Sequence, residues 1–148
     1  MAQILPKLIS LGTAVPPHRI TQADVLSILA EAKGQALPPR MAEILGNTGI
    51  SQRHIAMPPE YYFSARSWAG RAQVYKNTAA QMFEAAAVQA LARAGVKAAE
   101  IGQIVFVSTT GTMTPSLPSR MIASMGFAPD TRCVPLFGYG CAGGVLGL

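Results

Sequence analysis

The chain has 148 residues, of which 50% are hydrophobic and 13% are charged, and its net charge is +5. This composition excludes an intrinsically disordered protein, because disordered chains have few apolar residues and many charges. The Lys and Arg residues are scattered along the sequence instead of forming a run, so we do not expect a nucleic-acid partner. The positive excess fits an anionic ligand such as a phosphate-bearing molecule, or simply a solvated surface.

The chain holds two cysteines, Cys133 and Cys141, which are too few for a disulfide framework and lack metal-ligand spacing. A reducing compartment follows, so we expect a cytoplasmic protein. Because the first residues include no basic leader or small-residue cleavage site, we do not expect them to act as a signal peptide. The uncharged segment 101–119 contains several Gly and Pro residues, which argues against a membrane span.

The first third of the sequence predicts a strand followed by two helices. The apolar run 8–13 predicts an inner strand that leads into a proline-rich loop. Thr21 then predicts a helix N-cap, with Asp24 in the box position three residues later. A second short helix is predicted over 40–45, and residues 50–55 alternate weakly like an edge strand.

Strands and helices alternate over the rest of the chain. A long helix is predicted over 68–94, and the alanines along one face predict a flat, close contact with a neighbouring element. The β-branched run 104–109 predicts a strand buried on both faces, a helix follows over 116–125, and the next strand is predicted over 131–137. This order predicts an α/β fold with a largely parallel sheet covered by helices.

A hydroxyl-rich segment, residues 109–115, follows the first of these buried strands. Ligands of open α/β sheets bind outside the carboxyl ends of the strands, so these hydroxyls are candidates to line a pocket. They could equally be turn residues that satisfy local backbone groups.

Cys141 is the candidate nucleophile. It follows the last strand and a glycine turn at 138–140, and the pattern predicts a helix that begins at Cys141. Unpaired N–H groups and the positive end of the dipole at a helix start favour a thiolate. The alternative is an inert cysteine that acts as a small hydrophobic core residue.

The sequence ends at Leu148 inside an apolar helix without a polar tail. Because chain termini usually lie exposed on a surface, we expect this chain to be the N-terminal portion of a longer fold, or to need a partner that covers this face.

Taken together in their order, four segments resemble bacterial type III polyketide synthases of the chalcone synthase group. The resemblance spans essentially the whole chain. The segments are Ser10-Leu-Gly-Thr-Ala-Val-Pro-Pro17, Gly49-Ile-x-x-Arg53, Ile104-Val-Phe-Val-Ser-Thr-Thr-Gly-x-x-x-Pro115 and Gly138-x-Gly-Cys141-Ala-Gly-Gly.

The resemblance implies a homodimeric acyltransferase with a thiolase-like, layered αβαβα fold. Residues 1–148 would form its N-terminal domain, ending just after the nucleophile. Cys141 would take an acyl group from an acyl-CoA, and decarboxylated malonyl-CoA would extend it to a polyketide of the alkylpyrone or alkylresorcinol type. The CoA thioesters are substrates, and no separate cofactor or metal is implied.

Matching by position assigns further residues. Thr109, Thr110 and Gly140 would line the substrate pocket, and Thr114 takes the place of a residue, often Met, that the family lends to the neighbouring subunit's cavity. Arg40 matches a basic residue that binds the CoA phosphates. The family has two further basic residues of this kind, and Glu43 and Asn47 occupy their positions in this chain.

The family completes its site with a His and an Asn from a C-terminal half, which this chain does not contain. We therefore expect the chain alone neither to decarboxylate nor to condense malonyl-CoA. Two alternatives stay open. One is a non-catalytic module of the same fold, and the other is a different condensing enzyme of the superfamily, such as an initiating ketoacyl synthase or a hydroxymethylglutaryl-CoA synthase.

Overall fold

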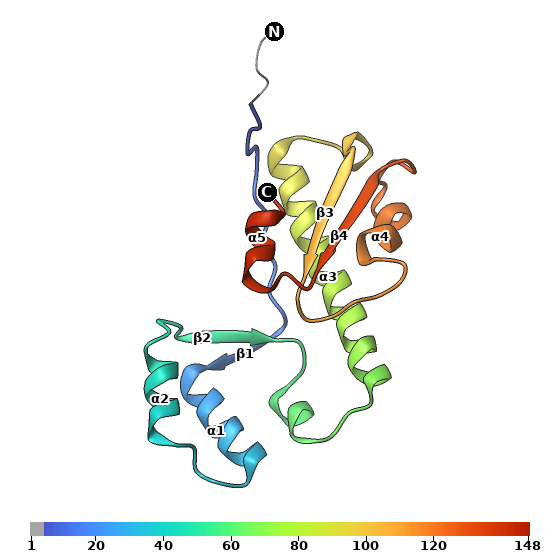
Figure 1. The fold of residues 1–148 in the computed structure, drawn as a ribbon. Helices are drawn as coiled ribbons and strands as arrows, with labels where there is room; N and C mark the ends of the chain where they lie inside the picture. Colours follow the sequence, from blue (N-terminus) through green and yellow to red (C-terminus); the bar gives the residue numbers. More distant parts are fainter. Residues whose placement is uncertain (1–4) are drawn as a thin grey trace. The chain divides into compact units, whose positions relative to one another are not determined.

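The computed structural model describes residues 5–148, and these residues form two compact units (Figure 1). One unit is the continuous segment Val15–Val74. The other combines the chain up to Ala14 with Tyr75–Leu148. Each unit contains its own small sheet, whereas the order of elements in the sequence predicted one largely parallel sheet.

The unit Val15–Val74 contains a two-stranded antiparallel sheet with helices beside it (Figure 1). Ile20 of one strand lies opposite Arg53 of the other. The elements in chain order are β1 (His18–Thr21), α1 (Gln22–Lys33), α2 (Pro39–Gly46), β2 (Gln52–Ile55) and the 3-10 helix η1 (Pro59–Phe63). The two helices and the edge strand β2 agree with the prediction, whereas β1 lies where a loop was expected.

The start of α1 confirms the predicted capping box. The Thr21 backbone N–H donates to the Asp24 carboxylate at 2.7 Å, and the Asp24 N–H donates to the Thr21 hydroxyl at 3.1 Å. The Thr21 backbone N–H and, after it, the Thr21 side chain hold the pKa of Asp24 below its ordinary value, because hydrogen bonding to the carboxylate favours its charged form.

The other unit contains a parallel pair of strands, as predicted. Its register places Gln103 opposite Arg132 and Ser108 opposite Phe137, so the two strands end side by side. The elements are the helix α3 (Trp68–Ala94), of which Tyr75–Ala94 belongs to this unit, then η2 (Ala98–Glu100), β3 (Gln103–Ser108), α4 (Leu117–Met125), β4 (Arg132–Phe137), η3 (Gly140–Ala142) and α5 (Gly143–Leu146).

The long helix α3 has the predicted bounds and the predicted close contacts. Its Phe83 ring meets Phe106 of β3 edge to face, with 6.0 Å between ring centroids. On its alanine face the backbone of Gly12 approaches so closely that a Cβ there would lie 2.8 Å from the Ala90 nitrogen. The lack of a side chain at Gly12 permits this approach to the backbone of α3.

Residues 8–13 do not form the predicted inner strand. They run along α3 instead, where the Ser10 hydroxyl donates to the Ala90 carbonyl at 2.8 Å and the Arg93 guanidinium donates to the Leu11 carbonyl at 2.6 Å. A strand needs a neighbour to complete its ladder of hydrogen bonds. Among the described residues, the sheet of β3 and β4 has no third strand that could pair with this segment.

The prediction that β3 is buried on both faces is also wrong for this chain. Val105 of β3 and Val134 of β4 each keep 38% of their surface exposed. Large hydrophobic residues that are buried within residues 5–148 are few, namely Ile20, Leu117 and Phe127. A sheet of two strands with α3 packed against it has too few neighbours to cover both faces of each strand.

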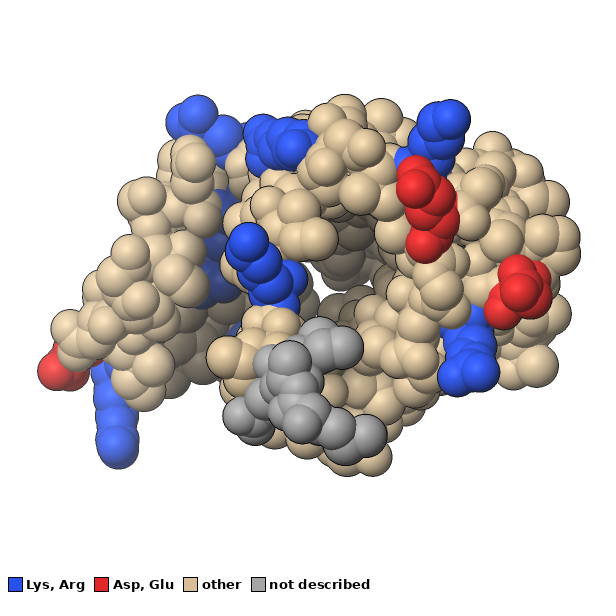
Figure 2. Space-filling view, turned by 90° about the horizontal axis from the view of Figure 1, so that it is seen from above, with Lys and Arg blue, Asp and Glu red and all other residues tan. Residues whose placement is uncertain are grey.

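Basic residues outnumber acidic ones in the chain, with 12 Lys and Arg against 7 Asp and Glu. Figure 2 shows Lys and Arg side chains at several places on the displayed face, some of them near one another. Over residues 5–148, no helix combines the length and the apolar character that crossing a bilayer requires.

Candidate functional site

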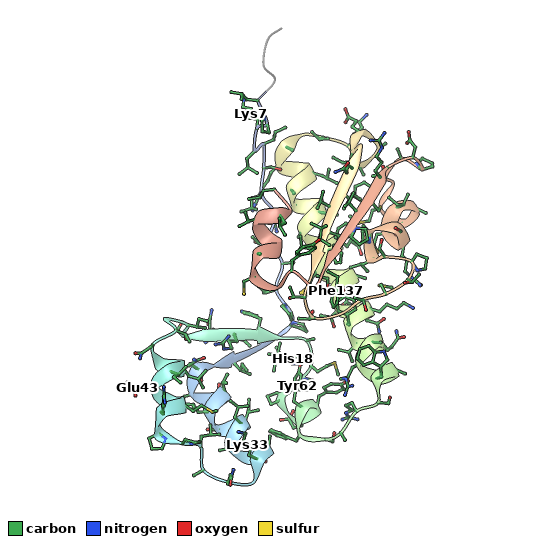
Figure 3. The ribbon with its side chains drawn as sticks, in the orientation of Figure 1. Lys7, His18, Lys33, Glu43, Tyr62 and Phe137 are labelled. Carbon is green, nitrogen blue, oxygen red and sulfur yellow. The ribbon has the colours of Figure 1, made fainter. Side chains whose placement is uncertain are left out.

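The candidate site lies at the carboxyl edge of the parallel strands β3 and β4. Because Ser108 is opposite Phe137, the segment that begins with Thr109 and the turn that begins with Gly138 leave the sheet at the same edge. Figure 3 shows Phe137 at this end of β4. The carboxyl edge of a parallel sheet is where open α/β folds bind ligands.

The turn after β4 presents Cys141 to solvent. Gly138 and Gly140 have φ values of 88° and 53°, a left-handed conformation that glycine adopts without strain. Cys141 is exposed, whereas Cys133 in β4 is half-buried. The predicted glycine turn is therefore confirmed, and the thiol of Cys141 is accessible to a reagent or substrate.

The helix start is displaced from its predicted position. Cys141 lies in the middle of the 3-10 turn η3, and α5 begins only at Gly143. The Ala142 N–H donates to the Tyr139 carbonyl at 3.2 Å, which closes this turn. With two glycines in left-handed conformation just before it, the chain enters the helix through a tighter turn than an α-helix provides.

The helix α5 is seated on β3 through glycines. A Cβ on Gly143 would lie 2.5 Å from one methyl group of Val107, and a Cβ on Gly147 would lie 2.9 Å from the other. Gly143 is buried in this contact. The absence of side chains at these positions lets the segment after Cys141 fold back onto the strand that leads to Thr109.

The segment after β3 is held by a pair of hydroxyl groups. The Ser108 hydroxyl donates to the Gly111 carbonyl at 2.6 Å, and its oxygen lies 2.9 Å from the Tyr75 hydroxyl oxygen. A Cβ on Gly111 would fall 2.6 Å from the Tyr75 ring atom Cδ2, so the Gly111 backbone lies directly on this ring.

The structure brings most of the predicted pocket residues to one edge. Thr109, Thr110, Gly140 and Cys141 all lie at the carboxyl edge of β3 and β4 and are exposed. Thr114 lies further along the same segment, exposed and followed by a cis peptide bond to Pro115. Their roles toward a substrate stay predictions.

The predicted CoA-binding residue lies in the unit Val15–Val74. Arg40 is exposed in the first turn of α2. Glu43, which Figure 3 shows on the same helix, and Asn47 at its C-cap are exposed as well. The role of Arg40 in binding phosphates stays a prediction.

Three residues that support the site were not identified from sequence. Tyr75 was not assigned to the contact face of the long helix, and Ser108 and Val107 were counted only as strand residues. The hydroxyl of Ser108 at a strand end was the one available signal, because a buried or half-buried hydroxyl needs a partner. Over the described part of the chain, no group of three or more His, Cys, Asp or Glu residues is arranged to bind a metal.

Comparisons with known proteins identify the family of the chain. The family model for chalcone and stilbene synthases, N-terminal domain, matches residues 2–148. The 1,3,6,8-tetrahydroxynaphthalene synthase of Streptomyces peucetius subsp. caesius is 34% identical over 92% of this chain, and that of Streptomyces griseus is 38% identical over 88%. The chain spans 37% and 36% of the lengths of these two relatives.

A solved structure shows the same fold. The crystal structure of 1,3,6,8-tetrahydroxynaphthalene synthase from Streptomyces coelicolor A3(2), a bacterial type III polyketide synthase, superposes with a TM-score of 0.82 at 34% identity. The match covers 91% of this chain and 40% of that structure. The two small sheets and their helices are thus part of a thiolase-like α/β fold, and the chain belongs to the chalcone and stilbene synthase family, whose N-terminal domain it matches.

Proposed function

We propose that this chain is the nucleophile-bearing portion of a type III polyketide synthase. The observation that carries the proposal is the exposed thiol of Cys141, held in a glycine turn at the same sheet edge as the hydroxyl-rich segment after β3. In this chain Cys141 is exposed, whereas Cys133 is half-buried.

The proposed reaction begins with acyl transfer to Cys141. The Cys141 thiolate attacks the carbonyl carbon of an acyl-CoA, the C–S bond to CoA breaks, and CoA leaves as a thiolate that takes up a proton. Malonyl-CoA then loses CO₂, and the carbanion equivalent attacks the thioester on Cys141. This step forms a C–C bond and releases the cysteine sulfur, so the extended acyl chain is carried on CoA. Dividing the reaction in this way is the advantage of a covalent intermediate.

The proposed roles of the other residues follow from their positions. Thr109, Thr110 and Gly140 would line the space next to the acyl group, and Thr114 would contribute to the cavity of a second subunit in a homodimer. Arg40 would bind the CoA phosphates as a cation. The substrates are themselves the CoA carriers, so the proposal includes no separate cofactor.

We expect condensation to need the rest of the synthase fold. The chain spans less than half of its relatives' length, and large apolar side chains such as Phe137, Val145 and Leu148 are exposed. A C-terminal portion of the same fold is the proposed partner of this surface. It would also supply the polar groups that stabilise the oxyanion and assist decarboxylation.

The experiment uses the two cysteines as a matched pair. The purified chain is incubated with hexanoyl-CoA, and acylation is measured by intact mass and located by peptide mass spectrometry. Acylation at Cys141 that is lost in Cys141→Ser and kept in Cys133→Ser is the expected result. Equal acylation of the Cys141→Ser variant would contradict the proposal. Adding malonyl-CoA to the chain alone should yield no pyrone or resorcinol product.

A further inference from the structure

We infer that Tyr75 and Ser108 are positioning residues for the acyl site. Their hydroxyl groups hold the segment Thr109–Gly111 in place at the edge where Cys141 lies. The inference rests on the proposed function, because this edge of the sheet is an acyl site only if Cys141 carries the acyl group.

The direction of the hydrogen bonds follows from the number of available protons. Ser108 has a single hydroxyl proton, which it donates to the Gly111 carbonyl at 2.6 Å. The Tyr75 hydroxyl, 2.9 Å away, must therefore be the donor to the Ser108 oxygen. The result is a continuous relay from the Tyr75 hydroxyl through Ser108 to the backbone of Gly111.

Tyr75 makes a second contact with the same segment through its ring. The Gly111 Cα lies over the ring so closely that a Cβ would come within 2.6 Å of Cδ2 and 2.7 Å of Cδ1. No larger residue fits at position 111 unless the ring moves. The ring and the hydroxyl of one tyrosine thus fix both ends of the short segment that contains Thr109 and Thr110.

The helix that carries Tyr75 explains how this residue can hold the segment Thr109–Gly111 in place. Tyr75 lies within the 27-residue helix α3, which also packs its Phe83 against β3. Thr109 and Thr110 are exposed, so little burial of their own side chains holds the loop in place. Their placement beside the Cys141 turn therefore depends on the relay. Tyr75 and Ser108 touch no substrate in this account and are not catalytic residues.

The test measures steric selectivity at the Cys141 thiol in the 148-residue chain. Rates of alkylation by N-ethylmaleimide and N-phenylmaleimide are determined for Cys141 by peptide mass spectrometry, and their ratio is compared between variants. A global loss of stability changes both rates together, whereas a change in the loop beside the thiol changes the ratio.

The variants are Tyr75→Phe, which keeps the ring and removes the hydroxyl, and Ser108→Ala, which breaks both hydrogen bonds. Ser108→Thr keeps a hydroxyl and should restore the wild-type ratio. Tyr61→Phe is the matched control, because within the described residues the buried Tyr61 hydroxyl has no hydrogen-bond partner. Amide exchange across residues 109–112 should be about fivefold faster in Tyr75→Phe than in wild type, as expected for one lost hydrogen bond.

A changed ratio in Tyr75→Phe and Ser108→Ala, with wild-type ratios in Ser108→Thr and Tyr61→Phe, supports the inference. An unchanged ratio and unchanged amide exchange in Tyr75→Phe overturn it, whether or not Ser108→Ala folds. The maleimides need no CoA chemistry. Failure of Cys141 to accept an acyl group from CoA would therefore count against the proposed function alone.

Discussion

The packing of α5 on β3 can be tested by adding a methyl group at Gly143 and removing two methyl groups from Val107. A Cβ at Gly143 would lie 2.5 Å from a Val107 methyl group, which is well inside van der Waals contact. Val107 is β-branched and stiff about χ1, so it cannot easily turn away. Gly143→Ala should therefore destabilise the chain, and Val107→Ala in the same molecule should relieve the clash.

The expected magnitudes follow from overpacking and lost burial. The added methyl group should cost about 1–3 kcal/mol in strain. Alanine also favours the helix by about 1 kcal/mol relative to glycine, which offsets part of that cost. Gly144→Ala is the matched control, because nothing lies within 4 Å of a Cβ at this neighbouring position and only the helix gain remains. Val107→Ala removes two half-buried methyl groups, which should lower the free energy of unfolding by about 1 kcal/mol.

The assay is urea denaturation of the wild type, the two single variants and the double variant, followed by circular dichroism. We expect the double variant to be more stable than the sum of the single effects by about 1–2 kcal/mol, the usual size for residues in direct contact. Additive effects, or equal stability of Gly143→Ala and Gly144→Ala, would show that α5 does not rest on Val107.

Two further predictions concern the unit Val15–Val74. Tyr61→Phe should raise the free energy of unfolding by about 1 kcal/mol in urea denaturation, because it removes a buried hydroxyl without a partner and keeps the ring under Arg66, whose Cζ is 4.6 Å from the centroid; a loss of stability would contradict this. Thr21 holds the pKa of Asp24 below its value in the unfolded chain, so the stabilising effect of the ionised carboxylate is complete above about pH 4 and is lost as the pH falls through the lowered folded-state pKa. Asp24→Asn should remove this part of the acid dependence, and parallel stability profiles of variant and wild type between pH 2 and pH 5 would refute the argument.

The sequence predicted those elements that are determined by residues close to one another in the chain. Thr21 and Asp24 specify a helix start through bonds that span three residues, and Gly126 ends α4 in a left-handed conformation. The long alanine-rich helix α3 was predicted with its observed bounds, because periodicity over many turns is a strong signal. The glycine turn before Cys141 was likewise contained in its own residues.

Elements that depend on distant partners could not be predicted in the same way. β1 is a strand because His18–Thr21 meets Gln52–Ile55, and nothing in its own four residues indicates that pairing. Residues 8–13 have the composition of an inner strand, yet their polar groups bond to α3 in this chain. Composition alone cannot distinguish a segment that pairs in a sheet from one that packs on a helix.

The candidate site shows the same division between local and distant causes. Cys141 could be identified from its own surroundings, since the glycines that shape its turn are its neighbours in sequence. Tyr75 could not, because its relation to Gly111 exists only once α3 has packed beside β3. The turn that presents the thiol is therefore specified by a few neighbouring residues. The residues that shape the space around the thiol are distant from it in the sequence. For this reason, substitutions at Tyr75 and Ser108 should change which molecules reach the Cys141 thiol more than they change the intrinsic reactivity of that thiol.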